Sequence, residues 1–264
     1  MILIKIGGGK NINWEYIAQD IKDLKEQVII VHGANAWMTE ISQKLGLTER
    51  TIISPSGQTS RYTDNKTMDL ITMVYSGLIN KKIVATLQKF GLNAIGLAGV
   101  DGKLWLGKRK DVILSQEGTK IKTIRDSLTG NVISVNKKLI ALLLGAGYIP
   151  VLTIPAITEK GEMINVDNDR AVALMVKDLN IKTVIMLFEA PGLLKDKDDE
   201  KLVIKTIKFD QLDKYIKNSE GRMRKKLLGM KEAFTHGLPK AYFGDGRIKS
   251  PITAALKGGG TIIS

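Results

Sequence analysis

Met1-Ile2-Leu3-Ile4-Lys5-Ile6-Gly7-Gly8-Gly9-Lys10 is the stretch that decides the fold. Its run of aliphatic residues predicts a strand buried on both faces, as in a parallel sheet. Lys5 then lies at the carboxyl end of this strand, where open α/β sheets bind their ligands. The glycines at 7, 8 and 9 allow the backbone to approach an anion and to direct amide N–H groups toward it. Two interpretations remain open, a phosphoryl-transfer site and a tight turn that carries a solvated lysine.

The composition excludes several classes of site. The 264 residues, 44% of them hydrophobic, are enough for a sizeable core. Cysteine is absent, which excludes disulfides and thiolate metal sites, and the two histidines argue against a multi-histidine centre. No run of 18 apolar residues and no signal-peptide pattern occur, and a cleaved leader would remove Lys5. We therefore expect a cytoplasmic protein with no membrane partner.

The charge balance predicts an acidic partner. Forty lysines and arginines against 27 acidic residues give a net charge of +13, which attracts a nucleotide, a nucleic acid or an acidic protein. The alternative is a lysine-rich surface that reflects proteome composition or growth temperature. A recognition-helix motif and a basic–aromatic stacking pattern are both missing, so no nucleic-acid partner is expected.

Strand-like and helix-like patterns alternate along the chain, which predicts an α/β fold with a mostly parallel sheet covered on both faces. The expected strands are 2–6, 28–31, 94–97, 149–154, 183–187 and 241–243, and the expected helices lie near 17–24, 38–45, 65–90, 136–144 and 171–179. Thr63 or Asp64 is expected to cap the long helix, Gly91 to end it, and Asp167 or Asn168 to cap the last. Residues 99–135 alternate polar and apolar positions, which predicts β-hairpins inserted at the edge of the sheet. A boundary is expected after residue 179.

Polar or glycine turns follow the predicted strands. In Val31-His32-Gly33-Ala34-Asn35, the glycine permits a tight turn and the next amides open a helix that favours an anion. His32 is interpreted as a packing residue at a strand end rather than as a catalytic base. In Ser60-Arg61-Tyr62-Thr63-Asp64, the arginine is either a surface residue or a bidentate partner for a substrate carboxylate.

Two later motifs concentrate charge. Asn165-Val166-Asp167-Asn168-Asp169 contains more capping residues than one helix needs, which leaves an acid to hold lysines and an amide to grip a substrate. Gly221-Arg222-Met223-Arg224-Lys225-Lys226 precedes a predicted helix that reaches Phe234, and its cations form either a solvated face or a site for nucleotide phosphate. The phosphate-loop, dinucleotide and nucleophile-elbow motifs are all missing.

Taken in order, these five motifs resemble the amino acid kinase family, and most closely its N-acetylglutamate kinase branch. The match runs from Lys5 to Gly260-Thr261. The resemblance implies a three-layer αβα sandwich, with the acceptor in residues 1–179 and ATP in residues 180–264. It also implies ATP-dependent phosphorylation of a side-chain carboxylate to an acyl phosphate, with Mg²⁺ on the ATP phosphates. A carboxylate is already a nucleophile, so catalysis rests on positioning and charge neutralisation.

The resemblance also assigns catalytic roles residue by residue. Lys5 stabilises the transferring phosphoryl group, Gly8 supplies N–H donors, and Asp169 orients the lysines. Lys226 stabilises the ADP side, and its neighbour Lys225 is the alternative for that role.

The remaining roles concern binding of the two substrates. The acceptor is expected to contact Gly33, Ala34, Asn35, Arg61 and Asn165. The ATP contacts are expected at Gly7, Gly9, Glu189, Gly192 and Lys226, with no metal held by the protein itself.

Three departures from the family pattern matter. Gly33-Ala34-Asn35 replaces a run of three glycines, and two side chains then project toward the head of the acceptor. Phe188-Glu189 replaces a serine or threonine followed by aspartate, which affects the adenine and ribose contacts. The extra amino-terminal helix of the arginine-inhibited kinases is absent, so feedback through that helix is not expected.

The motifs and the basic surface resemble the archaeal kinases of lysine and arginine biosynthesis. Those enzymes act on 2-aminoadipate or glutamate attached to a small acidic carrier protein, LysW. A basic face would steer this carrier to the site, and Lys103, Lys108, Arg109 and Lys110 are the residues expected to dock it. The alternative is an N-acetylglutamate kinase acting on the free acetylated amino acid, and uridylate or carbamate kinases fit less well. A homodimer is expected by the same resemblance.

Overall fold

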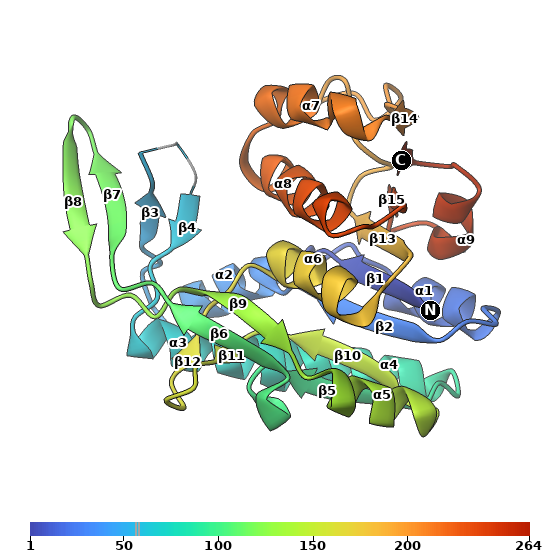
Figure 1. Ribbon diagram of the computed structural model, residues 1–264, viewed down its shortest axis with the longest axis horizontal. Helices are drawn as coiled ribbons and strands as arrows, with labels where there is room; N and C mark the ends of the chain where they lie inside the picture. The colour runs from blue at the N-terminus through green and yellow to red at the C-terminus, as the bar shows by residue number, and fades with distance from the viewer. Residues whose placement is uncertain (56, 58) are drawn as a thin grey trace.

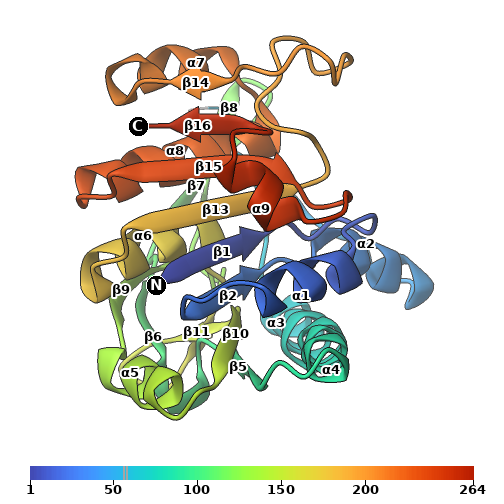
Figure 2. The same ribbon diagram turned by 90° about the vertical axis from the view of Figure 1, so that its right-hand side faces the viewer.

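The computed structural model describes residues 1–55, 57 and 59–264, and in this part of the chain eight strands form the central sheet (Figures 1 and 2). Their order is β14 (Thr206–Ile207), β16 (Thr261–Ile263), β15 (Lys240–Asp245), β13 (Thr183–Phe188), β1 (Ile2–Ile6), β2 (Val28–His32), β10 (Ile149–Thr153) and β5 (Ala94–Ala98). All neighbouring pairs are parallel except β15 with β16. The mostly parallel sheet is confirmed.

Helices cover both faces of this sheet. They are α1 (Trp14–Lys22), α2 (Asn35–Lys44), α3 (Asn65–Ile71), a π-helix (Thr72–Ile79), α4 (Asn80–Lys89), α5 (Lys137–Gly145), α6 (Asn168–Leu179), α7 (Leu212–Asn218), α8 (Gly221–Thr235) and α9 (Pro251–Leu256). On one face α1 packs against α4 and α9, and on the other α6 packs against α8 (Figure 2). The three-layer αβα sandwich is therefore confirmed.

Strand β1 lies at the centre because its sequence is apolar on both faces. Ile2, Leu3, Ile4 and Ile6 are all at most 3% exposed. Each such side chain stabilises the fold by about 1.5–3 kcal/mol relative to an exposed position. β13 and β2 flank β1 in parallel register, so the carboxyl ends of the three strands meet at one edge.

The capping residues show where two of the predicted helices begin and where a third ends. The Asp64 carboxylate accepts the Thr67 N–H at 2.8 Å and begins α3. The Asp167 carboxylate accepts the Asp169 N–H at 2.8 Å and begins α6. Gly91 follows α4 with a φ of +76°, a conformation that glycine adopts without strain.

Residues 99–135 form hairpins, as predicted, but their expected place at the edge of the central sheet was wrong. β6 (Trp105–Arg109) and β9 (Gly130–Val135) join β11 (Ala156–Ile157) and β12 (Met163–Ile164) in a second sheet, which contacts α6 through β9. β7 (Ile113–Glu117) and β8 (Lys120–Ile124) form a ribbon beside the pair β3 (Thr51–Ile53) and β4 (Thr59–Arg61) (Figure 1). A period of two specifies strands but not their partners.

Two further features refine the expectations. The cations of residues 222–226 lie within the first turns of α8 rather than before it. The central sheet runs continuously across the expected boundary at residue 179, because β13 pairs with β1, and the division into two lobes stays a prediction. The helical segment 65–89 is long and apolar enough to span a membrane, yet 44% of its apolar window is buried within the fold.

His32 ends β2 as a buried, neutral packing residue. Its Nδ1 lies 3.2 Å from the Gly33 carbonyl and its Nε2 lies 3.1 Å from the Asn80 side-chain nitrogen. The Asn80 Nδ2 can only donate, so the His32 Nε2 accepts and the ring proton is on Nδ1. Burial lowers the pKa of His32 to about 4. With both ring nitrogens engaged, this imidazole is not placed to act as a base.

The stability of the fold should consequently fall in mild acid. Between pH 6.5 and 4 the unfolded chain protonates His32 while the folded chain does not, so protons favour the unfolded state. The free energy of unfolding should drop by up to about 3 kcal/mol across this interval from this residue alone. Urea denaturation at pH 7, 5.5 and 4.5 measures the drop, and His32→Gln should flatten it. Equal pH dependence in the two proteins would contradict the assignment.

Candidate active site

The two turns that follow β1 and β2 are in direct contact. A Cβ atom at Gly8 would lie 2.4 Å from the backbone nitrogen of Asn35 and 2.5 Å from that of Ala34. The Ala36 N–H donates to the Gly8 carbonyl at 3.0 Å, and the Gly33 N–H donates to the Ile6 carbonyl at 2.9 Å. Glycine is therefore required at position 8, because any side chain there would separate the turns.

A buried ion pair lies beside these turns. The Lys5 Nζ is 2.7 Å from the Asp169 Oδ1, and the two side chains are 7% and 9% exposed. Burial alone would raise the pKa of Asp169, but Lys5 and then Lys226 outweigh burial and hold this pKa below its usual value. Asp169 is thus an ionised carboxylate that pairs with Lys5 and is also stabilised by the charge of Lys226, from a distant part of the chain.

Lys226 reaches this pair because α8 and α6 pack closely. A Cβ atom at Gly229 would lie 2.9 Å from the Cβ and from the carbonyl oxygen of Asp169, so only glycine permits this approach. Lys226 precedes Gly229 by about one turn of α8, and its Nζ lies 5.7 Å from the centre of the Phe188 ring. Burial, followed by the charge of Lys5, lowers the pKa of Lys226 to about 8.

Lys225, the alternative to Lys226, points elsewhere. Its Nζ donates a hydrogen bond to the backbone carbonyl of Thr59 in β4. The charge of Lys225 contributes less than that of Lys226 to the lowered pKa of Asp169. The geometry therefore favours Lys226 as the lysine that faces Lys5 across Asp169.

Three of the expected ATP contacts gather at the glycine loop. The Glu189 Oε1 accepts the Asn11 N–H at 2.6 Å. A Cβ atom at Gly9 would lie 2.1 Å from the Glu189 carboxyl carbon, and the Gly7 N–H donates to the Leu187 carbonyl at 2.8 Å. Glu189 is thus bound to the loop backbone. Its replacement of the family's shorter aspartate gives the loop a side-chain anchor.

Gly192, the fourth expected ATP contact, lies against β16. A Cβ atom there would lie 2.6 Å from the Thr261 Oγ1, which accepts the Leu193 N–H at 2.8 Å. Close packing of this turn on the strand therefore explains the glycine without a ligand.

Arg61 and Asn165, both expected to bind the acceptor, are connected through Thr63. The Asn165 Nδ2 donates to the Thr63 Oγ1 at 2.9 Å, and that hydroxyl donates to the Arg61 carbonyl at 3.2 Å. The Arg61 guanidinium pairs with Glu49, with its Nη2 3.2 and 3.3 Å from the two carboxylate oxygens. Sequence reasoning missed Glu49, which no motif marks.

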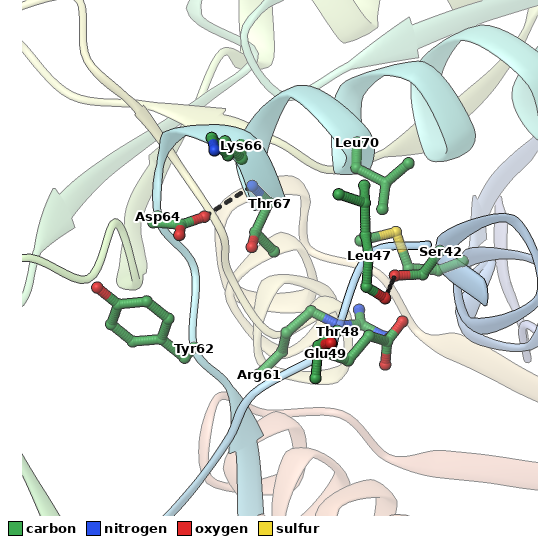
Figure 3. A pocket seen from close by; sticks show the side chains of 11 residues that line it. Ser42, Leu47, Thr48, Glu49, Arg61, Tyr62, Asp64, Lys66, Thr67 and Leu70 are labelled. Atoms are coloured by element: carbon green, nitrogen blue, oxygen red, sulfur yellow. Dashed lines mark hydrogen bonds and ion pairs between the residues drawn. The ribbon is translucent and has the colours of Figure 1, made fainter. Parts of the chain in front are cut away.

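A small pocket surrounds this arginine (Figure 3). Its volume is about 100 Å³, and the side chains of α2, α3 and the β4 end form its walls. The lining residues are Met38, Ser42, Leu47, Thr48, Glu49, Arg61, Tyr62, Asp64, Lys66, Thr67 and Leu70. Figure 3 shows Arg61 reaching toward Glu49 and Thr48 between the loop 47–49 and the start of α3.

Tyr75 is a second residue that sequence reasoning missed. It is 3% exposed, and its hydroxyl donates to the Asn35 Oδ1 at 2.7 Å. The signal was present in the sequence, because a tyrosine within the apolar run Thr72–Ile79 requires a buried hydrogen-bond partner.

The basic residues proposed to dock a carrier are only partly available. Lys103 pairs with Glu159 at 3.4 Å, and Arg109 pairs with Glu162 at 2.6 Å while it donates to two backbone carbonyls. Burial, followed by the charge of Arg170, lowers the pKa of Lys110. Two of the four cations thus neutralise carboxylates of the same chain, and the role of these residues in docking a carrier stays a prediction.

Among residues 1–55, 57 and 59–264, no three side chains of histidine, aspartate or glutamate are grouped to hold a metal ion. Mg²⁺ is usually held largely by phosphate oxygens and water in sites of this kind, and its place on the ATP phosphates stays a prediction.

Comparison with known proteins identifies relatives over the whole chain. A [LysW]-aminoadipate kinase of Deinococcus radiodurans is 42% identical over all of this chain and 91% of the relative. The enzyme of that name from Thermus thermophilus is 41% identical over the full length of both chains. A putative [LysW]-aminoadipate/[LysW]-glutamate kinase of Nitrosopumilus maritimus is 39% identical over 97% of this chain and 96% of its own.

Solved structures support the same fold. N-acetylglutamate synthase of Neisseria gonorrhoeae superposes with a TM-score of 0.80 at 17% identity, and this chain spans 59% of that protein. The superposition with an isopentenyl phosphate kinase covers 100% of both chains, with a TM-score of 0.67 at 17% identity. The model of the amino acid kinase family matches residues 1–245. The chain belongs to the amino acid kinase family.

Proposed function

We propose that this protein is an ATP-dependent kinase that phosphorylates the side-chain carboxylate of 2-aminoadipate carried by LysW. The full-length similarity to two kinases that bear this name supports the substrate. The cluster of Lys5, Asp169 and Lys226 supports the chemistry. This cluster is the observation that carries the proposal, since a buried lysine without an ion pair favours an anionic ligand.

The charge balance of the cluster suits phosphoryl transfer. Lys5 pairs with Asp169, whereas Lys226 forms no ion pair among the residues that the structure describes, so its positive charge is poorly compensated in a poorly solvated place. Burial and the neighbouring lysine make that charge unfavourable in the free protein, as the lowered pKa of Lys226 indicates. The equatorial oxygens of a transferring phosphoryl group would neutralise it, and the stabilisation would be greatest in the transition state.

The reaction needs no general base in this arrangement. The acceptor carboxylate attacks directly, and the leaving ADP oxygen needs only charge neutralisation. We assign Lys5 to the phosphoryl group, Lys226 to the ADP side, and Asp169 to the orientation of both. Gly8 would present its backbone N–H to the phosphoryl group. Because it has no side chain, its turn can pack directly against the backbone of residues 33–35.

We assign the acceptor to the side of the cluster that lies away from ADP. Arg61 would hold a carboxylate, and the backbone of Gly33, Ala34 and Asn35 together with the Asn165 amide would hold the remainder. The ATP phosphates would lie at Gly7 and Gly9, with Glu189 and Gly192 shaping the nucleotide side. A bound Mg²⁺ would supply charge neutralisation on the phosphates.

Several expectations belong to this proposal. Residues 1–179 would form the acceptor lobe and residues 180–264 the ATP lobe. A homodimer in the cytoplasm, without a nucleic-acid or membrane partner, is expected by resemblance to the family.

The deciding experiment offers the purified enzyme two acceptors. LysW bearing 2-aminoadipate should be phosphorylated in the presence of ATP and Mg²⁺, and free N-acetylglutamate should be a far poorer substrate. ADP release and hydroxylamine trapping of the acyl phosphate measure both reactions. A preference for N-acetylglutamate would replace the proposal by the alternative function, and LysW bearing glutamate tests how strictly chain length is selected.

Removal of Lys5 should lower turnover with little change in acceptor binding. Lys5→Ala should reduce kcat about 10²–10³-fold, as loss of one oxyanion-type donor does in other enzymes. Lys89→Ala is a matched control, because Lys89 also pairs with a carboxylate, Glu15, but at the surface. Steady-state kinetics of both variants decide the point. Near-normal kcat in Lys5→Ala would refute the role.

The pH dependence should report Lys226. Its pKa of about 8 in the free enzyme means that the cation is present below pH 8 and lost above it. The kcat/KM for ATP should therefore fall above about pH 8, since this parameter follows the free enzyme. Lys226→Arg should keep a cation at high pH and move this fall upward. An unchanged alkaline limb in that variant would assign the limb to another group.

A further inference from the structure

The residues assigned to the acceptor converge on one hydroxyl group. The Tyr75 hydroxyl donates to the Asn35 Oδ1 at 2.7 Å. The Arg61 guanidinium and the Ala34 backbone lie near enough to the Tyr75 oxygen to oppose the rise in pKa that burial gives this tyrosine. Tyr75 therefore binds Asn35 and lies close to two further parts of the expected acceptor site.

The direction of the bond between Tyr75 and Asn35 fixes the orientation of the Asn35 amide. An amide oxygen can only accept, so the Tyr75 hydroxyl gives its proton to the Asn35 Oδ1. The amide oxygen of Asn35 is then occupied by Tyr75. Its Nδ2, which has no hydrogen-bond partner within residues 1–55, 57 and 59–264, keeps two N–H groups for a ligand.

The π-helix is what places Tyr75 here. Tyr75 reaches Asn35, and five positions later the Asn80 Nδ2 lies 3.1 Å from the His32 Nε2, so both side chains contact the same turn. In an α-helix, side chains five positions apart lie about 140° apart around the axis. The wider turn of residues 72–79 brings them toward one face.

We propose that Tyr75 is a positioning residue of the acceptor site, which holds the Asn35 amide so that its Nδ2 donates to an oxygen of the acidic acceptor. This inference rests on the proposed function and assigns the recognition step within it. With Asn35 held by the tyrosine and Arg61 held by Glu49, the site presents N–H donors from both side chains. Such a surface selects carboxylate and amide-carbonyl oxygens.

The test separates acceptor binding from chemistry. Tyr75→Phe keeps the ring and its packing and removes the hydroxyl. It should raise the KM for LysW-bound aminoadipate about tenfold, the effect of one hydrogen bond of about 1.4 kcal/mol. The kcat and the KM for ATP should stay within about twofold.

Ser76→Ala is the matched control from the next position. The Ser76 hydroxyl donates to the Ile154 carbonyl at 2.9 Å, so this variant also loses one hydrogen bond from the π-helix, but away from Asn35. It should alter thermal stability as Tyr75→Phe does and leave the KM for the acceptor unchanged. Equal KM increases in the two variants would assign the effect to the helix and overturn the inference.

A double-mutant cycle tests whether Tyr75 acts through Asn35. Asn35→Ala should raise the KM for the acceptor at least as much as Tyr75→Phe, and the double variant should resemble Asn35→Ala alone. Additive increases in KM would overturn the inference, and so would an unchanged KM in Asn35→Ala. The Asn35 side chain is only partly buried, so its removal should disturb folding little. An unmodified enzyme without turnover would instead refute the proposed function.

Discussion

The buried ion pair between Lys5 and Asp169 is the contact on which the arrangement of this molecule depends. It joins the end of the central strand β1 to the first turn of α6, which begins more than 160 residues later. Removal of one partner from a buried pair is strongly destabilising, because it leaves an uncompensated charge. The chain keeps this buried pair at the carboxyl end of the central strand β1, beside the turns that follow β1 and β2.

Much of the fold was predictable because hydrophobic periodicity is a local property. The strand from Ile2 to Ile6 has the expected bounds, and the caps at Asp64 and Asp167 were among the candidates. The destination of the hairpins was not predictable, since alternation specifies a strand but leaves its partner open. Leu104 and Trp105 are completely buried. This tertiary packing holds the second sheet beside α6, so its strands do not pair with β5 at the edge of the central sheet.

The site was predictable where motifs carry charge and glycine, and unpredictable where one side chain supports another. The pair of Lys5 and Asp169 was expected from the motifs and lies together in the structure. The pairing of Arg61 with Glu49 and the bond from Tyr75 to Asn35 join segments that no spacing relates. Such contacts arise from tertiary structure, so a single sequence indicates at most that a buried tyrosine needs a partner.

The glycine in the middle of α8 exposes a conflict between folding and catalysis. An alanine at an exposed helical position would favour the helix by about 1 kcal/mol. At Gly229 it would collide with Asp169 and push α8 away from α6. Helix propensity alone would thus favour a residue that the close packing of α8 on α6 excludes. Engineering of a more heat-resistant variant should leave this position untouched and seek its gains on the solvent side of the helix.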